Sequence, residues 1–86
     1  MLYHPTYTAA ISTALDSAEE LGYSYDENEY FDTIAIGTSR PKVGETSRFS
    51  LRLRHNSMKA TDADVYIHVQ VYGMESGMYE LNFYIL

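Results

Sequence analysis

The second half of the chain alternates apolar and polar residues, and this period of two constrains the fold more than any other feature. In residues 45–55, Phe49, Leu51 and Leu53 alternate with polar and basic residues, and stretches 64–72 and 78–86 follow the same rule. Alternation sends successive side chains to opposite faces of a strand, so the pattern predicts three strands with one buried face each. The loop Gly73–Gly77 between the last two predicts a hairpin.

The first part of the chain follows a helical period instead. An apolar stripe predicts a helix over 5–21, with Pro5 at the first helical position and Gly22 as the left-handed residue after the last turn. Residues 30–37, with the sequence YFDTIAIG, alternate only weakly, but they predict a fourth strand whose inward face stays undefined. The stripe consists of Tyr7, Ile11, Ala14, Leu15, Ala18 and Leu21.

These elements predict one two-layer α+β domain over residues 1–86. The N-terminal helix packs on one face of a four-stranded antiparallel meander sheet, in the order αββββ, because short loops join the successive strands. A single helical stripe covers only one face, so the other face of the sheet stays open. The predicted core is Tyr7, Ile11, Leu15, Phe49, Leu51, Leu53, Val65, Ile67, Val69, Leu81, Phe83 and Ile85.

The open face is the first candidate binding surface, because tyrosine and arginine are the residue types enriched at the energetic centres of interfaces. It would serve as a contact with a protein partner or a second copy, or as a platform for stacking nucleic-acid bases. A third interpretation is that cross-strand pairs simply stabilise an exposed sheet. The candidate residues on this face are Arg48, Arg52, Arg54, Tyr66, His68, Tyr72 and Tyr84.

Charge is sorted along the chain. Residues 1–39 contain seven acidic residues and no Lys or Arg, whereas residues 40–59 contain all six basic residues and one Glu. A ridge of carboxylates imitates the spaced phosphates of nucleic acid and would occupy a basic groove, although a solvated helix end has the same composition. This acidic ridge is the second candidate surface, and its residues are Asp16, Glu19, Glu20, Asp26, Glu27, Glu29 and Asp32.

No catalytic or metal-binding motif is present. The chain has no cysteine, and its three histidines are scattered without the spacing of a metal site. The loop 37–44 contains two cations and two hydroxyl groups, which suit a phosphate. It lacks the spacing of a P-loop, so we interpret it as a loop that connects two strands. We therefore predict neither enzyme activity nor a cofactor. The N-terminal residues lack the pattern of a signal peptide, and no apolar run is long enough to span a bilayer, so a cytoplasmic protein is expected.

Two stretches, EYFDTIAIGTSRPKVGETSRFSLRL and HVQVYGMESGMYELNFYIL, resemble small proteins encoded by phages, prophages and plasmids. The overall profile is similar to that of anti-CRISPR proteins and other inhibitors of bacterial defence. The resemblance implies a short, acidic, non-enzymatic protein that blocks a nucleic-acid-handling machine by occupying its surface. It implies no particular site residues.

The leading hypothesis is therefore a small acidic phage-type inhibitor that binds a CRISPR-Cas-like nucleoprotein complex in the cytoplasm of its bacterial host. The alternatives are a nucleic-acid-binding module that uses the aromatic and basic sheet face, and a structural homodimer. The net charge of −6 argues against direct binding of nucleic acid and against a membrane surface. The expected partner is a protein or nucleoprotein defence complex.

Overall fold

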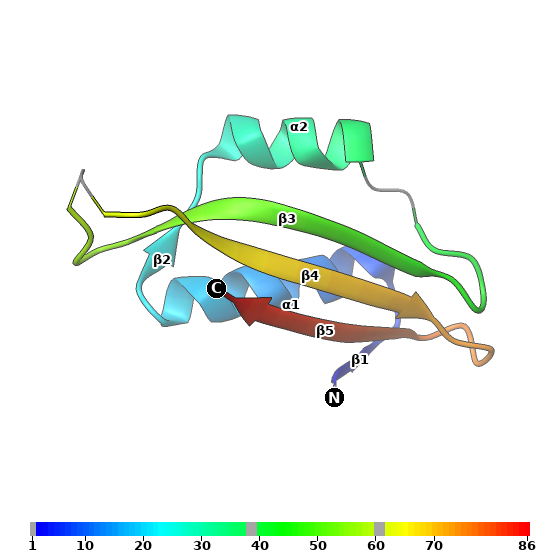
Figure 1. The fold of residues 1–86 in the computed structure, drawn as a ribbon. Coiled ribbons are helices and arrows are strands. Elements are labelled where there is room, and N and C mark those ends of the chain that lie inside the picture. The colour runs from blue at the N-terminus through cyan, green and yellow to red at the C-terminus, as the bar shows by residue number, and fades with distance from the viewer. Residues whose placement is uncertain (1, 38–39, 60–61) are drawn as a thin grey trace.

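The computed structural model describes residues 2–37, 40–59 and 62–86, and it shows an α+β fold (Figure 1). Five strands form an antiparallel sheet in the order β1-β5-β4-β3-β2. The α+β class and the meander of three successive strands are confirmed, whereas the numbers of helices and strands differ from the prediction. The elements are β1 (Leu2–His4), α1 (Tyr7–Glu20), β2 (Tyr23–Ser24), α2 (Glu27–Gly37), β3 (Thr46–His55), β4 (Val65–Gly73) and β5 (Tyr79–Ile85).

Helix α1 forms where its apolar stripe predicts it, but its start differs. The N-cap is Thr6, whose hydroxyl accepts a hydrogen bond from the backbone N–H of Ala9 at 3.1 Å. Pro5 therefore lies before the cap and not at the first helical position. The helix ends as expected, since Gly22 adopts φ +93°. The buried stripe is Tyr7, Ala10, Ile11, Ala14, Leu15 and Ala18.

The predicted inward and outward faces of the long strands are confirmed. Leu51 of β3 lies opposite Ile67 of β4, and Arg52 lies opposite Tyr66 on the other face. Because the side-chain period of a strand is two, one correct pair fixes the face of every residue in both strands. The predicted core residues Val65, Phe83 and Ile85 are half-buried, and the fully buried sheet residues are Phe49, Leu51, Leu53, Ile67, Val69, Val71 and Leu81.

The predicted strand 30–37 is wrong, because these residues belong to helix α2. Asp26 caps this helix, since its Oδ1 accepts hydrogen bonds from the backbone N–H groups of Asn28 at 2.8 Å and Glu29 at 3.2 Å. Tyr30 and Ile34, one turn apart, pack against the edge of the core. The cap and this i, i+4 pair outweigh the β-branched residues that favoured a strand.

Strands β1 and β2 were not predicted, and both are short edge strands. β1 pairs with residues 79–81 of β5, and β2 pairs with Arg54 and His55 at the end of β3. His55 ties β2 to the end of α1, because its Nε2 lies 3.0 Å from the carbonyl oxygen of Leu21. The prediction placed a strand formed by residues 30–37 next to β3 in the sheet. In the structure the neighbour of β3 at this edge is β2, and residues 30–37 are part of α2.

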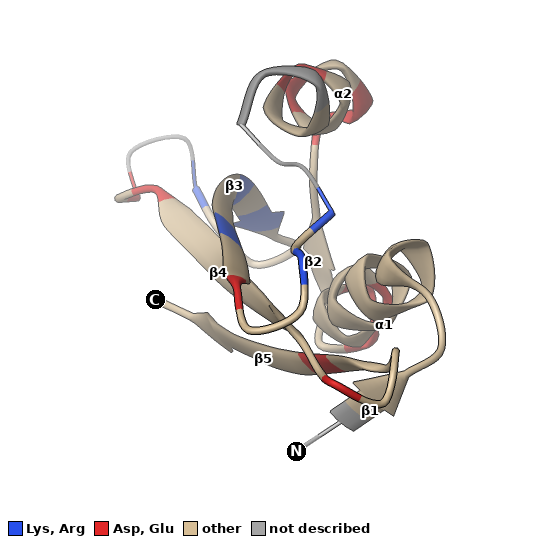
Figure 2. Ribbon diagram, turned by 90° about the vertical axis from the view of Figure 1, so that its right-hand side faces the viewer, with Lys and Arg blue, Asp and Glu red and all other residues tan. Residues whose placement is uncertain are grey.

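The sheet has one covered face and one open face. Figure 2 shows α1 on one side of the sheet, while α2 lies beyond β3, the strand that it contacts. Acidic residues mark both helices, and basic residues mark β3 and the segment that leads into it. Within the described residues, no helix has the length and apolar character needed to cross a membrane.

Candidate binding surface on the open face of the sheet

Strand pairing arranges the side chains of the open face in rows across the sheet. One row joins Thr46, Tyr72, Glu80 and Tyr3 from β3, β4, β5 and β1. The next rows join Arg48, Gln70 and Asn82, then Ser50, His68 and Tyr84, and finally Arg52 and Tyr66. Partners in a row lie on the same face with Cβ atoms about 5 Å apart, so they form one continuous surface. The strands thus bring together all the predicted face residues of β3, β4 and β5 except Arg54, whose partner is Ser24 of β2.

Tyrosine dominates the exposed part of this surface. The exposed fractions are 38% for Tyr66, 40% for Tyr72, 50% for Tyr84 and 52% for Tyr3. Tyr3 was missed by the sequence analysis because a three-residue strand shows no alternation. A tyrosine surface of this kind offers large contact area with few torsions to freeze on binding.

His68 lies at the centre of the surface and is held on two sides. Its Nδ1 lies 2.8 Å from Oγ of Ser50 on β3, and its ring stacks on Tyr84 of β5 with centroids 4.8 Å apart and planes at 25°. The Tyr66 ring is 6.4 Å away. These contacts fix the rings in place before any ligand arrives, which reduces the entropy lost on binding.

The arginines of β3 have three different environments. Arg52 forms an ion pair with Glu29 of α2, and the two side chains are 48% and 38% exposed. Arg54 donates a hydrogen bond to the carbonyl oxygen of Lys59 at 3.3 Å. Arg48 lies beside Gln70 in the row given above, away from both contacts. The predicted basic edge is therefore partly neutralised at its α2 end and not at the start of β3.

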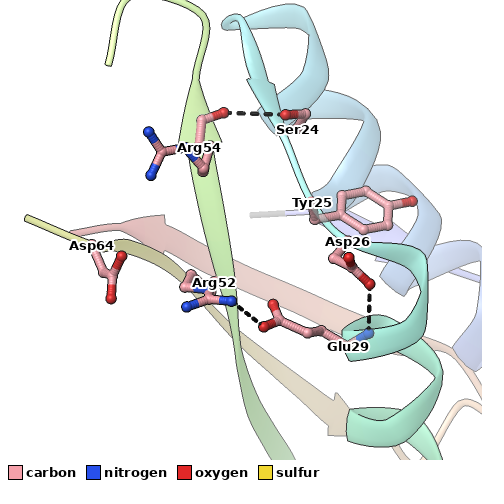
Figure 3. Close-up of a pocket in the computed structure, with 7 residues that line it drawn as sticks. All are labelled: Ser24, Tyr25, Asp26, Glu29, Arg52, Arg54 and Asp64. Carbon is pink, nitrogen blue, oxygen red and sulfur yellow. Dashed lines mark hydrogen bonds and ion pairs between the residues drawn. The ribbon is translucent and has the colours of Figure 1, made fainter. Parts of the chain in front are cut away.

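A cleft of about 410 Å³ separates α2 from the end of β3 (Figure 3). Arg52 reaches across it toward Glu29, and Tyr25 points away from the two arginines that line it. Asp26 and Asp64 add two further carboxylates to its walls. Its charges are thus mixed, and Asp26 is already engaged as the cap of α2.

Three of the residues predicted as one acidic ridge lie near Tyr25, and the others occupy separate environments. Burial raises the pKa of Tyr25, and the negative charges of Glu19, Glu27 and Asp16 raise it further, so carboxylates of both helices lie near this phenol. Glu29 instead faces Arg52, and Asp32 lines a hollow near Tyr66. The remaining residue, Glu20, is exposed at the end of α1.

Comparison of the chain with models of known protein families, with curated protein sequences and with solved structures finds no match. Among the described residues, no three His, Asp or Glu side chains are grouped so that they could hold a metal ion. The functional interpretation therefore comes from the surface itself.

Proposed function

We propose that this chain is a binding protein without catalytic activity, and that it contacts a partner protein through the open face of its sheet. The observation that carries the proposal is the set of exposed tyrosines Tyr3, Tyr66, Tyr72 and Tyr84 on one face, beside arginines and the stacked His68. A solvated face without a partner typically mixes charged residues of both signs and few large aromatics. Aromatic and arginine residues in one continuous patch are typical of interface centres.

The finer form of this proposal is that the partner is a nucleoprotein defence complex of a bacterial host, which the protein inhibits in the cytoplasm. The distribution of charge supports it, since carboxylates of α1 and α2 gather near Tyr25 while the arginines lie along β3. Carboxylates held at fixed spacing compete with phosphates for a basic groove. A single target with a basic groove and an apolar rim would engage both surfaces.

The test uses purified CRISPR effector complexes immobilised for binding measurements, with target-DNA cleavage as the functional readout. We expect the protein to bind one such complex and to suppress its cleavage. The double variant Tyr66→Ala/Tyr72→Ala should weaken binding by more than ~1 kcal/mol per tyrosine. Thr8→Ala, an exposed position on α1, is the matched control and should bind normally.

The results test separately whether the open face is the contact surface and whether the protein inhibits the complex that it binds. If the tyrosine variant binds its partner as tightly as the parent protein, the open face is not the contact surface. If the protein binds a complex but leaves cleavage unchanged, it is a binding protein and not an inhibitor.

A homodimer is a second candidate, and one edge of the sheet favours it. β1 covers only residues 79–81 of β5, so within the described residues the outer edge of Asn82–Ile85 has no strand partner. Tyr66 and Leu86 exchange two backbone hydrogen bonds, of 3.1 and 2.9 Å. The backbone groups of Ile85 therefore point away from β4, toward this free edge.

Unpaired edges are templates for pairing with another strand. Sedimentation equilibrium would distinguish a 9.8 kDa monomer from a dimer. If the protein dimerises through this edge, Ile85→Pro should restore the monomer, because it removes a backbone N–H donor from the edge. A monomer at every accessible concentration would exclude this candidate.

A further inference from the structure

A second hollow, at the start of β3, concentrates positive charge. Its volume is about 410 Å³, and Arg40, Lys42 and Arg48 line it together with the hydroxyl-bearing Thr46 and Ser47. Three of the six basic residues of a chain with net charge −6 thus share one concavity. The feature is not explained by the tyrosine surface, because Arg40 and Lys42 belong to the segment that precedes the strand.

These three cations lack a carboxylate partner in the described part of the chain. The ion pair found there joins Arg52 and Glu29, and Glu45, which also lines the hollow, pairs with none of the three. Like charges close together repel one another unless an opposite charge lies between them. The hollow is therefore suited to an anion, and the Thr46 hydroxyl can donate a hydrogen bond to it, whereas Oγ of Ser47 is already paired with the Tyr7 hydroxyl at 3.0 Å.

The segment that bears Lys42 is held rigidly against the end of β4. The backbone N–H of Gly44 donates to the carbonyl of Gly73 at 2.8 Å, and the N–H of Gly73 donates to the carbonyl of Glu45 at 3.0 Å. The approach is so close that a Cβ on Gly73 would lie 2.5 Å from the carbonyl oxygen of Lys42. The backbone under Lys42 is thus positioned before a ligand binds, which reduces the ordering cost of binding.

The neighbouring part of the open face offers a place for a planar ring. Arg48 also lines a hollow of about 250 Å³ whose other walls include Ser50, His68, Gln70 and Tyr84. The stacked rings of His68 and Tyr84 provide aromatic surface, and the Gln70 amide provides both a hydrogen-bond donor and an acceptor. Aromatic side chains of this kind stack with nucleobases, and an amide can pair with a base edge.

We propose that the two hollows together form a binding site for a nucleoside monophosphate, with the phosphate between Arg40, Lys42 and Arg48 and the base against His68 and Tyr84. Arg48 lines both hollows and joins the two parts of the site. A phosphate monoester carries nearly two negative charges at pH 7, which suits three cations. The cations suit a terminal phosphate monoester better than a backbone phosphodiester, because a diester carries only one negative charge.

The same chemistry is found on a free nucleotide and on the phosphorylated end of a nucleic-acid strand. The site does not depend on the proposed function, since nucleotide binding requires no partner protein. Nucleotide binding is measured on the isolated protein. The partner contact is tested instead through Tyr66 and Tyr72, which line neither hollow.

The experiment is a titration of the full chain, followed by NMR and calorimetry, with five probes: AMP, adenosine, inorganic phosphate, and an oligonucleotide in its 5′-phosphorylated and 5′-hydroxyl forms. We expect AMP to bind more tightly than adenosine or phosphate and to shift the amide signals of residues 40–48. Arg48→Ala and Lys42→Ala should each weaken AMP binding roughly tenfold, because each removes a charge-assisted hydrogen bond. The matched control Arg54→Ala removes a cation that lines neither hollow and should bind AMP normally.

A second pair of variants tests the part of the site that is proposed to hold the base. Tyr84→Ala should weaken AMP binding about tenfold and leave phosphate binding unchanged, whereas Tyr72→Ala should leave both unchanged. Tighter binding of the 5′-phosphorylated oligonucleotide than of AMP would identify a strand end as the source, and the reverse would identify a free nucleotide. The proposal is overturned if AMP at millimolar concentration shifts no signal in residues 40–48. It is equally overturned if Arg54→Ala weakens AMP binding as much as Arg48→Ala, or if adenosine binds as tightly as AMP.

Discussion

Leu51 and Arg52 are neighbours in the sequence and lie on opposite faces of β3. Leu51 is 2% exposed and lies opposite Ile67 in the core, whereas Arg52 is exposed and faces Glu29. Leu51→Ala should lower the free energy of unfolding by roughly 2–5 kcal/mol, because it removes buried methyl groups and leaves a cavity. Urea denaturation measures this loss, with Ser50→Ala on the open face as the comparison. A loss no larger than that of Ser50→Ala would contradict the register of the sheet.

Tyr25 gives a residue-scale prediction at alkaline pH. Burial and the carboxylates of Glu19, Glu27 and Asp16 raise the pKa of its phenol above the usual value of 10.0 in the folded state. The folded chain then holds this proton more tightly than the unfolded chain, so the contribution to stability is complete below pH 10 and is lost as pH rises through the folded pKa. Tyr25→Phe has no such group, and its stability should fall less steeply above pH 10. Urea denaturation at a series of pH values tests this, and parallel curves for the two proteins would contradict it.

At the scale of elements, α2 depends on its first turn. Asp26 accepts hydrogen bonds from two backbone N–H groups that the helix leaves free. Asp26→Ala should therefore lower the free energy of unfolding by roughly 0.5–2 kcal/mol, whereas Asp26→Asn keeps the acceptor oxygen and should lower it much less. Thermal unfolding followed by circular dichroism compares the two. The ion pair between Glu29 and Arg52 adds little, since exposed pairs are worth about 0–1 kcal/mol.

The sequence predicts elements whose local signal is long and periodic. Strands β3 and β4 carry four or more alternations each, and their inward and outward faces were predicted correctly, whereas the pairing of Tyr66 with Arg52 is known only from the structure. Helix α2 was missed because Thr33, Ile34 and Ile36 are β-branched and weigh toward a strand in isolation. β1 and β2 are too short to show a period, and only their pairing with β5 and β3 makes them strands.

In the candidate sites too, the sequence predicts the face on which a residue lies but not the tertiary contacts that it makes. Alternation alone placed Tyr66, His68 and Tyr84 on one surface, because it fixes the face of each residue. The contact between Glu29 and Arg52 joins a helix to a strand, and no sequence period relates the two. The basic hollow likewise depends on how the segment with Lys42 docks beside Gly73, which is a tertiary contact.

At the scale of the whole molecule, the charge order of the sequence becomes a spatial order. The acidic first half folds into α1 and α2, and the basic middle folds into β3 and the segment before it (Figure 2). A molecule with separate acidic and basic regions has a strong electrostatic dipole, which steers association and depends on ionic strength. Either the helices or the sheet face leads in binding the proposed partner, and the two alternatives respond differently to charge and salt.

Reversal of charge at the end of α1 decides between them. Glu19 and Glu20 lie in the last turn of α1, where the helix dipole disfavours anions, so Glu19→Lys/Glu20→Lys should preserve the fold and stabilise it by about 0.3–1 kcal/mol per site. Glu27 is left unchanged, because it lies in the first turn of α2, where its charge is favourable. If the acidic helices lead, this variant loses partner binding, and the affinity of the parent protein falls steeply as salt rises from 50 to about 500 mM. If the tyrosine surface leads, the variant binds normally and Tyr66→Ala/Tyr72→Ala does not. We expect the second result, because desolvated aromatic contacts contribute most of the binding energy in interfaces of this composition. The test is to measure the affinity of the parent protein and of both variants for the partner over a series of salt concentrations.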